Sequence, residues 1–306
     1  MSDYVDMTAR VGGLTLKNPV LAASGTFGYG REYTPYLDPA RLGGLVTKGV
    51  SLLPRVGNPP PRIAETACGM LNAIGLANVG IEAFIEEKLP FLAHLDTVVV
   101  VNLYGERVEE FGELAARLDG RLGVSALEVN VSCPNVKEGG MAFGVDANAV
   151  ERVTREVCRH TSLPVWVKLT PNLSDPVPVA RAAQAGGAAA VSLINTLLGM
   201  SIDARTQRPR LANVLGGLSG PAIKPVGLRM VWQVARAVDL PVVGLGGIAC
   251  GEDAAEYLLA GASAVQVGTA SFRDPAACLR VVDELAEFCR AEEIPRVAEL
   301  VGGLKV

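Results

Sequence analysis

Cys133 is the side chain of this sequence whose type and position point most clearly to chemistry. It follows an alternating apolar run, ALEVNV, and stands in the turn sequence Ser-Cys-Pro-Asn. A cysteine used only for packing is expected inside a strand or on a buried helix face. A thiol on a loop can instead act as a general base, through its thiolate, or as a nucleophile. The nucleophile is the weaker alternative, because such cysteines normally have a base partner such as histidine and none is evident.

Two lysines each end an apolar run, Lys48 in LVTK and Lys168 in VWVK. Surface lysines often lay their stems along apolar residues. A buried ammonium, however, needs an anionic partner, because desolvating its charge alone is costly. We therefore interpret both lysines as groups that face a carboxylate or an electron-rich ring.

Glycine pairs and amides complete the candidate set. Gly246–Gly247 and Gly268–Thr269 follow two late apolar runs. Glycines often only close tight turns, but they also let backbone N–H groups approach a phosphate closely. Amide side chains suit a flat heterocycle, because each can donate and accept at once. The amides in question are Asn72, Asn102, Asn130 and Asn195, with Thr196 beside the last.

Several common catalytic groups are missing where the apolar runs end. His94 and His160 fall near predicted helix ends, and no carboxylate stands at a predicted strand end. The six cysteines include no CxxC pair. We therefore expect no metal site, iron–sulfur cluster or disulfide framework on this chain. Any proton transfer is assigned to a lysine or to Cys133.

A repeating series of short strands and longer helices must position these residues. The predicted strands are apolar on both faces, as parallel strands covered on each side are. Helical patterns such as GEDAAEYLLAGA lie between most of them. The eight predicted strands are Pro19–Ala23, Gly44–Thr47, Thr97–Val101, Leu127–Val131, Val165–Leu169, Ala189–Ile194, Val242–Leu245 and Ala264–Val267.

Eight such units without a linker predict one α/β domain over residues 1–306, a (β/α)8 TIM barrel. A doubly wound open sheet is the alternative, but LAASGTFGYG lacks the GxGxxG spacing. The segment ARVGGLTLKNP predicts an N-terminal hairpin at the barrel bottom. Connections of roughly 30 residues follow the second and sixth strands and are expected to fold as ordered loops over the barrel mouth. Barrel active sites lie at the C-terminal strand ends, so the candidate residues should meet there.

Composition narrows the functional classes. The 306 residues carry a formal net charge of −4 and no long basic run, which argues against nucleic acid as a partner. The polar N-terminus, MSDYVDMTAR, does not resemble a signal peptide. Every apolar stretch is interrupted before the ~18 residues that a spanning helix needs. We expect a cytoplasmic protein with reduced cysteines and no membrane contact.

Together these motifs resemble those of the class 1 dihydroorotate dehydrogenases, flavin enzymes of pyrimidine biosynthesis. The resemblance covers nearly the whole chain and is most specific in NVSCPNVKEGGMAFG, ETACGMLNAIGLAN, LINTLLGM to GGLSGPAIKP, GLGGI and VQVGTASF. It implies one FMN across the barrel mouth and Cys133 as the catalytic base on a mobile loop. Cys133 would take a proton from one carbon of dihydroorotate while a hydride leaves the neighbouring carbon for the flavin. Lys168 would stabilise negative charge on the reduced flavin.

The resemblance also implies which residues bind each ligand, and it implies no metal ligand. The FMN positions are Ser24, Lys48, Gly49, Asn102, Asn130, Lys168, Ile194, Gly220, Gly246, Gly247, Gly268 and Thr269. The substrate positions are Lys48, Asn72, Ala73, Ile74, Gly75, Leu76, Asn130, Asn195 and Thr196.

Within the family, NVKEGGMAFG and the long segment after the sixth strand look like class 1B, which passes electrons to NAD. In that subclass a second subunit carries FAD and a 2Fe–2S cluster, and a homodimer of this chain would join it in a heterotetramer. The enzyme alternatives are a fumarate-reducing class 1A homodimer and an FMN barrel acting on another dihydropyrimidine. A non-catalytic barrel for a phosphorylated ligand would explain the glycines but leave Cys133, Lys48 and Lys168 without a role.

Overall fold

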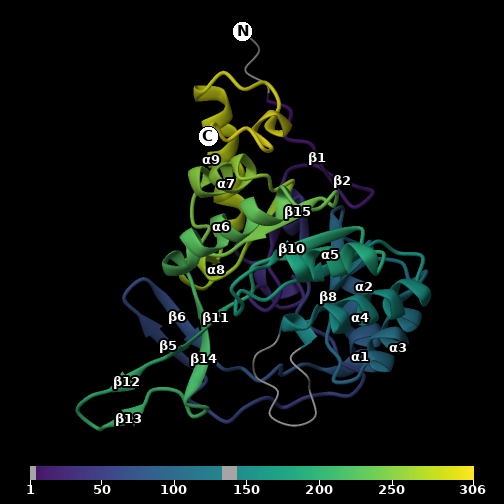
Figure 1. The fold of residues 1–306 in the computed structure, drawn as a ribbon, viewed down its shortest axis with the longest axis vertical. Helices are drawn as coiled ribbons and strands as arrows, with labels where there is room; N and C mark the ends of the chain where they lie inside the picture. The colour runs from purple at the N-terminus through teal and green to yellow at the C-terminus, as the bar shows by residue number, and fades with distance from the viewer. Residues whose placement is uncertain (1–4, 133–142) are drawn as a thin grey trace.

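Eight parallel strands close into a barrel in the computed structural model, which describes residues 5–132 and 143–306 (Figure 1). Neighbouring strands in the barrel follow one another along the chain, and the last pairs with the first. The prediction of a (β/α)8 barrel is confirmed, with each strand within two residues of its expected ends. The strands are β3 (Val20–Ala22), β4 (Gly44–Val46), β7 (Val98–Leu103), β8 (Ala126–Asn130), β9 (Val165–Lys168), β10 (Ala190–Leu193), β15 (Val242–Leu245) and β16 (Ala264–Val267).

Helices cover the outside of the barrel, except between β3 and β4, where two short 3₁₀ turns, Arg31–Tyr33 and Pro39–Arg41, take the place of a helix. Asp146 caps the helix Ala147–Arg159 by accepting a hydrogen bond from the backbone N–H of Asn148. Asp175 accepts from the backbone N–H of Val177 at the start of the next helix. The helices are α1 (Gly80–Ala83) continuing through a wide turn (Phe84–Lys88) into α2 (Leu89–Leu92), then α3 (Val108–Leu118), α4 (Ala147–Arg159), α5 (Val177–Ala185), α6 (Lys224–Ala235), α7 (Gly251–Leu259), α8 (Ala270–Arg273) and α9 (Ala277–Ala291).

A hairpin closes the N-terminal end of the barrel, as predicted. It consists of β1 (Ala9–Val11) and β2 (Leu14–Leu16), which pair antiparallel. Val11 and Leu16 are fully buried in the same apolar cluster as Trp166, which fills the barrel interior. This end of the barrel is therefore packed with side chains and offers no room for a ligand.

The barrel interior changes from apolar to polar over two residues. The apolar cluster inside the barrel includes one residue from each of the eight strands: Leu21, Val46, Val100, Ala126, Trp166, Ala190, Val243 and Ala264. Side chains in a strand point to the same side every second residue. Two residues further toward the mouth, β3 and β15 keep the apolar Ala23 and Leu245, whereas the other six positions are polar. These six, here called the polar layer, are Lys48, Asn102, Glu128, Lys168, Ser192 and Gln266.

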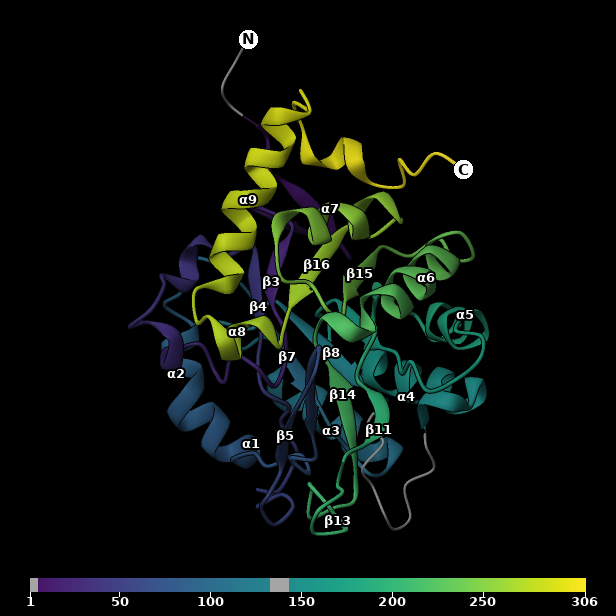
Figure 2. The same cartoon turned by 90° about the vertical axis from the view of Figure 1, so that its left-hand side faces the viewer.

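The two long loops form ordered structure and pair with each other. Their strands make a four-stranded antiparallel sheet in the order β11-β14-β6-β5, so that segments more than a hundred residues apart share hydrogen bonds. Figure 2 shows this sheet at the end of the molecule opposite α9. The sequence predicted ordered loops but not their pairing. The strands are β5 (Ile63–Thr66), β6 (Gly69–Asn72), β11 (Leu197–Met200) and β14 (Leu215–Ser219), with a small hairpin of β12 (Ile202–Asp203) and β13 (Arg208–Pro209) beyond them.

Candidate active site

Glu128 lies at the centre of the polar layer beneath the barrel mouth. Its carboxylate is fully buried. It accepts hydrogen bonds from Asn102 Nδ2 at 2.7 Å, Ser192 Oγ at 2.7 Å and Gln266 Nε2 at 2.9 Å. The Lys168 ammonium is 3.6 Å from the carboxylate oxygen that Asn102 also contacts. Four strands thus direct a donor at one carboxylate.

Glu128 is the anionic partner that buried Lys168 requires, and the sequence analysis missed it. The search for carboxylates covered only the residues that end each strand, whereas Glu128 lies inside β8, two residues before Asn130. A charged residue within an otherwise apolar strand was the signal available. Ser192 and Gln266 were missed for the same reason, since both lie inside β10 and β16.

Lys48 has a different environment from Lys168. Among the described residues, no carboxylate lies within ion-pair distance of its ammonium. Partial burial and, to a smaller extent, the nearby positive charge of Arg62 lower the pKa of Lys48. Of the two lysines, Lys48 is therefore the one that can offer its charge to an anionic ligand.

The predicted substrate amides are brought together by a chain of hydrogen bonds. Asn195 Nδ2 donates to Ser132 Oγ at 2.6 Å, and Ser132 Oγ donates to Asn130 Oδ1 at 2.8 Å. Thr196 follows and packs so closely on Gly217 that a Cβ there would lie 2.0 Å from Thr196 Oγ1. Asn72 Nδ2 donates to the carbonyl of Gly217 at 3.3 Å. The loops after β4 and β10 thus place these amides beside one another.

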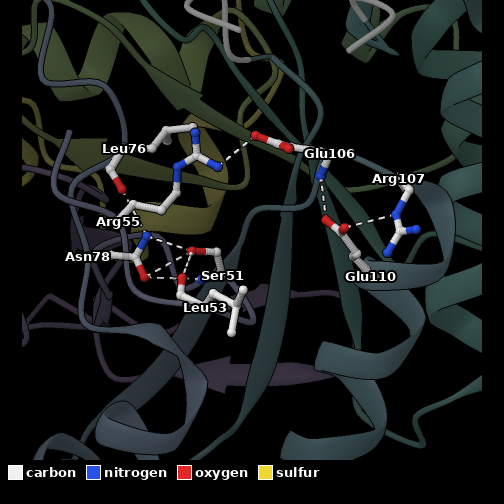
Figure 3. Close-up of polar contacts among 8 residues, drawn as sticks. All are labelled: Ser51, Leu53, Arg55, Leu76, Asn78, Glu106, Arg107 and Glu110. Atoms are coloured by element: carbon white, nitrogen blue, oxygen red, sulfur yellow. Dashed lines mark hydrogen bonds and ion pairs between the residues drawn. The ribbon is translucent and has the colours of Figure 1, made fainter. Parts of the chain in front are cut away.

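The predicted substrate segment Ala73–Leu76, here called the strap, accepts hydrogen bonds from the side chains of two asparagines. Asn58 Nδ2 donates to the carbonyl of Ala73 at 3.0 Å. Asn78 Nδ2 donates to the carbonyl of Leu76 at 2.8 Å (Figure 3). Asn78 Oδ1 accepts from the backbone N–H of Gly80. Leu76 has a φ of 59°, a strained value for a bulky residue. Asn78 stabilises this conformation.

A polar cavity of about 520 Å³ lies on the outer side of the strap. Of the predicted site residues, only Gly75 lines it. Its charges are already paired: Arg55 binds Glu106 at 2.7 Å, and Glu110 binds Arg107 at 3.0 Å (Figure 3). The cavity is therefore separate from the polar layer inside the barrel.

The glycines after β15 and β16 leave backbone donors available. Gly246 and Gly247 have positive φ values of 124° and 77°, which favour glycine. The buried hydroxyl of Tyr257 donates to the carbonyl of Gly246 at 2.7 Å and fixes this turn. Within the described part of the chain, no group accepts from the backbone N–H of Gly247, Gly268 or Thr269. These three donors suit an anion such as a phosphate.

The other predicted FMN residues also lie at strand ends near the mouth. Ser24 follows β3, whose Ala22 pairs with Val267 immediately before Gly268. A Cβ on Gly49 would lie 3.0 Å from Asn102 Oδ1, so Gly49 gives that oxygen room. Ile194 is buried directly after β10. Gly220 follows β14 with a positive φ of 96°.

Some predictions fall elsewhere in the molecule. Cys133 lies outside the described residues. His94 and His160 lie at helix ends, as predicted, each with a ring nitrogen against a backbone carbonyl of its own helix. Residues 5–132 and 143–306 contain no group of three side chains suited to a metal ion. The same residues include no helix long and apolar enough to cross a membrane.

Replacement of Asn78 tests how much this side chain contributes to holding the strap. Asn78→Ala should lower the free energy of unfolding by about 2 kcal/mol or more, because it leaves several buried backbone groups unpaired. Asn78→Asp keeps the accepting oxygen but loses the donor to Leu76, so its loss should be smaller. Urea unfolding of wild type and the two variants measures this. A loss below about 0.5 kcal/mol in Asn78→Ala would contradict the account.

Comparison with known proteins agrees with this geometry. The family model described as dihydroorotate dehydrogenase matches residues 6–289. The chain is 58% identical over 301 residues to the dihydroorotate dehydrogenase B (NAD(+)) catalytic subunit of Geobacter sp. (strain M21), covering 98% of this chain and 99% of that protein. The protein of the same name from Solidesulfovibrio magneticus is 54% identical over 303 residues, covering 99% of each chain. This chain belongs to the dihydroorotate dehydrogenase family.

Proposed function

We propose that this chain oxidises (S)-dihydroorotate to orotate with one bound FMN, in the synthesis of pyrimidine nucleotides. The observation that carries the proposal is the polar layer of a closed barrel, where amides, two lysines and free backbone donors meet at one mouth. Membership of the dihydroorotate dehydrogenase family supports the same reaction.

The residues at the mouth fit a flavin mononucleotide. Asn102 Oδ1 and Gln266 Oε1 are buried and have no hydrogen-bond donor among the described residues. The flavin ring carries one N–H when oxidised and gains another on reduction, and the ribityl chain has hydroxyl groups, so both oxygens can accept hydrogen bonds from FMN. The N–H groups of Gly247, Gly268 and Thr269 can bind the phosphate. When bound, FMN supplies the acceptor for the two electrons that dihydroorotate loses. The residues predicted from the sequence and proposed to hold it are Ser24, Lys48, Gly49, Asn102, Asn130, Lys168, Ile194, Gly220, Gly246, Gly247, Gly268 and Thr269. The structure adds Gln266 to this proposed set.

The remaining polar groups fit dihydroorotate, which combines a carboxylate with a ring of amide N–H and C=O groups. Lys48 has no internal counter-ion among the described residues and can pair with the carboxylate. The amides of Asn72, Asn130 and Asn195 can bind the ring edges, with Thr196 beside them. The strap Ala73–Leu76 would complete the pocket.

We assign the role of general base to Cys133, which stands three residues after Asn130. Glu128 is not a competing base, because its two oxygens already accept from Asn102, Ser192 and Gln266 and lie beside Lys168. The two histidines lie at helix ends. Lys168 is proposed to stabilise the negative charge that develops when electrons reach the flavin.

The electron acceptor is proposed from the relatives, which are named as NAD(+)-dependent catalytic subunits. On this basis the chain passes electrons to NAD through a partner subunit that carries FAD and a 2Fe–2S cluster. A homodimer of this chain would join that subunit in a cytoplasmic heterotetramer. Reduction of fumarate by a homodimer remains the alternative acceptor scheme.

The proposed reaction is tested by loading the purified chain with FMN and adding substrates without oxygen. Dihydroorotate should bleach the flavin absorption, whereas dihydrouracil, which lacks the carboxylate, should not. A chain that takes up no FMN, or an FMN-loaded chain that dihydroorotate does not bleach, would overturn the proposal.

Replacement of Cys133 tests its assignment. Cys133→Ala should retain FMN but slow flavin reduction by about 10²–10⁴-fold near neutral pH, since that is the usual contribution of a general base. Cys133→Ser should keep part of the activity, most visibly at high pH, because its hydroxyl is the weaker acid. Stopped-flow reduction in a single turnover measures both variants. An unchanged rate in Cys133→Ala would remove this thiol from the mechanism.

Lys48 predicts a pH dependence of orotate binding. Its ammonium should bind the orotate carboxylate while protonated and release it as pH rises through the lysine pKa. Burial and Arg62 lower that pKa from 10.5, so the loss of affinity should begin below pH 10.5. Arg62→Gln removes the opposing charge and should move the loss to higher pH. The change in flavin absorption on orotate binding reports affinity, and Lys48→Met controls for titration of orotate itself. Superimposable profiles for wild type and Arg62→Gln would contradict this role.

A further inference from the structure

Glu128 is a buried charge for which the proposed reaction has no direct use. It is fully buried, and four other members of the polar layer contact it: Asn102, Lys168, Ser192 and Gln266. Burying a carboxylate costs free energy unless every oxygen has a hydrogen-bond or ion-pair partner, so a buried carboxylate in a binding site is expected to have a role. Lys168 alone would explain one ion pair but not three further donors aimed at the same group.

The chemistry of a carboxylate dictates how the neighbouring amides are turned. At neutral pH a carboxylate accepts hydrogen bonds and donates none. Asn102 and Gln266 must therefore present their NH2 groups to Glu128, as they do at 2.7 and 2.9 Å. Their carbonyl oxygens then face away, and both are buried without a donor among the described residues.

Gly49 leaves room for the carbonyl oxygen of Asn102 on the side opposite Glu128. Asn102 Oδ1 lies where a Cβ on Gly49 would approach within 3.0 Å, so the absence of a side chain at Gly49 leaves that oxygen its space. Exchanging the amide oxygen and nitrogen would point a carbonyl at the Glu128 carboxylate, which is repulsive. The positions of these two hydrogen-bond acceptors at the barrel mouth are therefore fixed before a ligand binds.

We propose that Glu128 is a positioning residue that sets both the hydrogen-bond acceptors and the charge of the flavin site. It orients Asn102 and Gln266 so that their carbonyl oxygens accept hydrogen bonds from the flavin. Its negative charge balances the positive charge of Lys168. This inference rests on the proposed flavin-dependent function. It makes Lys48 the uncompensated cation of the polar layer, since Lys168 already has its partner. The negative charge of Glu128 also offsets part of the positive potential of Lys168, so the site stabilises electrons added to the flavin less strongly.

The test measures the midpoint potential of bound FMN in wild type and in Glu128→Gln. Removal of a negative charge beside the ring should shift the potential to a more positive value. The loss of the charge-assisted hydrogen bonds should also weaken FMN binding by about tenfold or more. Glu128→Asp keeps the charge on a shorter side chain, so its potential should stay closer to wild type. Ser192→Ala removes one donor to Glu128 but no charge, so it should shift the potential less than Glu128→Gln does.

The outcomes separate charge from packing. A positive shift in Glu128→Gln that exceeds the shift in Glu128→Asp supports the inference. If only Glu128→Gln fails to retain FMN, the requirement for the charge is supported as well. Equal potentials in wild type and Glu128→Gln, equal shifts in the two variants, or loss of FMN from both folded variants would overturn it. A wild-type chain that binds no FMN would instead overturn the proposed function on which the inference depends.

Discussion

The ion pair between Glu128 and Lys168, inside a closed barrel, is the interaction on which the rest of the site depends. Two opposite charges that are almost completely removed from water cost several kcal/mol each to desolvate. Such a pair is tolerated only with further hydrogen bonds, and Asn102, Ser192 and Gln266 supply them to the carboxylate. Because these donors come from different strands, the charge pair constrains one end of the whole barrel.

The geometry of the barrel explains why this layer can exist. Alternation along the strands places apolar side chains inside the N-terminal half, where the hairpin β1–β2 and Trp166 seal it. Two residues later along the strands, the inward-pointing side chains lie at the barrel mouth, where polar groups can face a ligand. Asn102, Glu128, Lys168, Ser192 and Gln266 thus stand on barrel strands, and the long loops pair into a separate sheet beside them. Asn58 and Asn78 then fix the strap between the barrel and the outer cavity.

Much of this arrangement was predictable from the sequence, because strand ends are easy to locate. Lys168, Asn130 and the glycines after β15 and β16 all follow clear apolar runs, and the structure places them around one mouth. Glu128, Ser192 and Gln266 were not predicted, because each interrupts a strand instead of ending it. The pairing of β6 with β14 could not be read from the sequence either, since no local pattern links segments so far apart. The role of Asn78 depends on that tertiary arrangement, and the role of Cys133 stays a prediction.

The most direct measurement is a crystal structure of the chain with FMN and orotate bound. The account predicts that Asn102 Oδ1 and Lys168 contact the flavin ring and that the backbone of Gly247, Gly268 and Thr269 binds the phosphate. Orotate should lie between the ring and the Asn130–Ser132–Asn195 chain, with its carboxylate on Lys48. A flavin bound elsewhere, or one whose ring leaves Asn102 and Lys168 without contact, would contradict the central claim that the polar layer of the barrel is the flavin site.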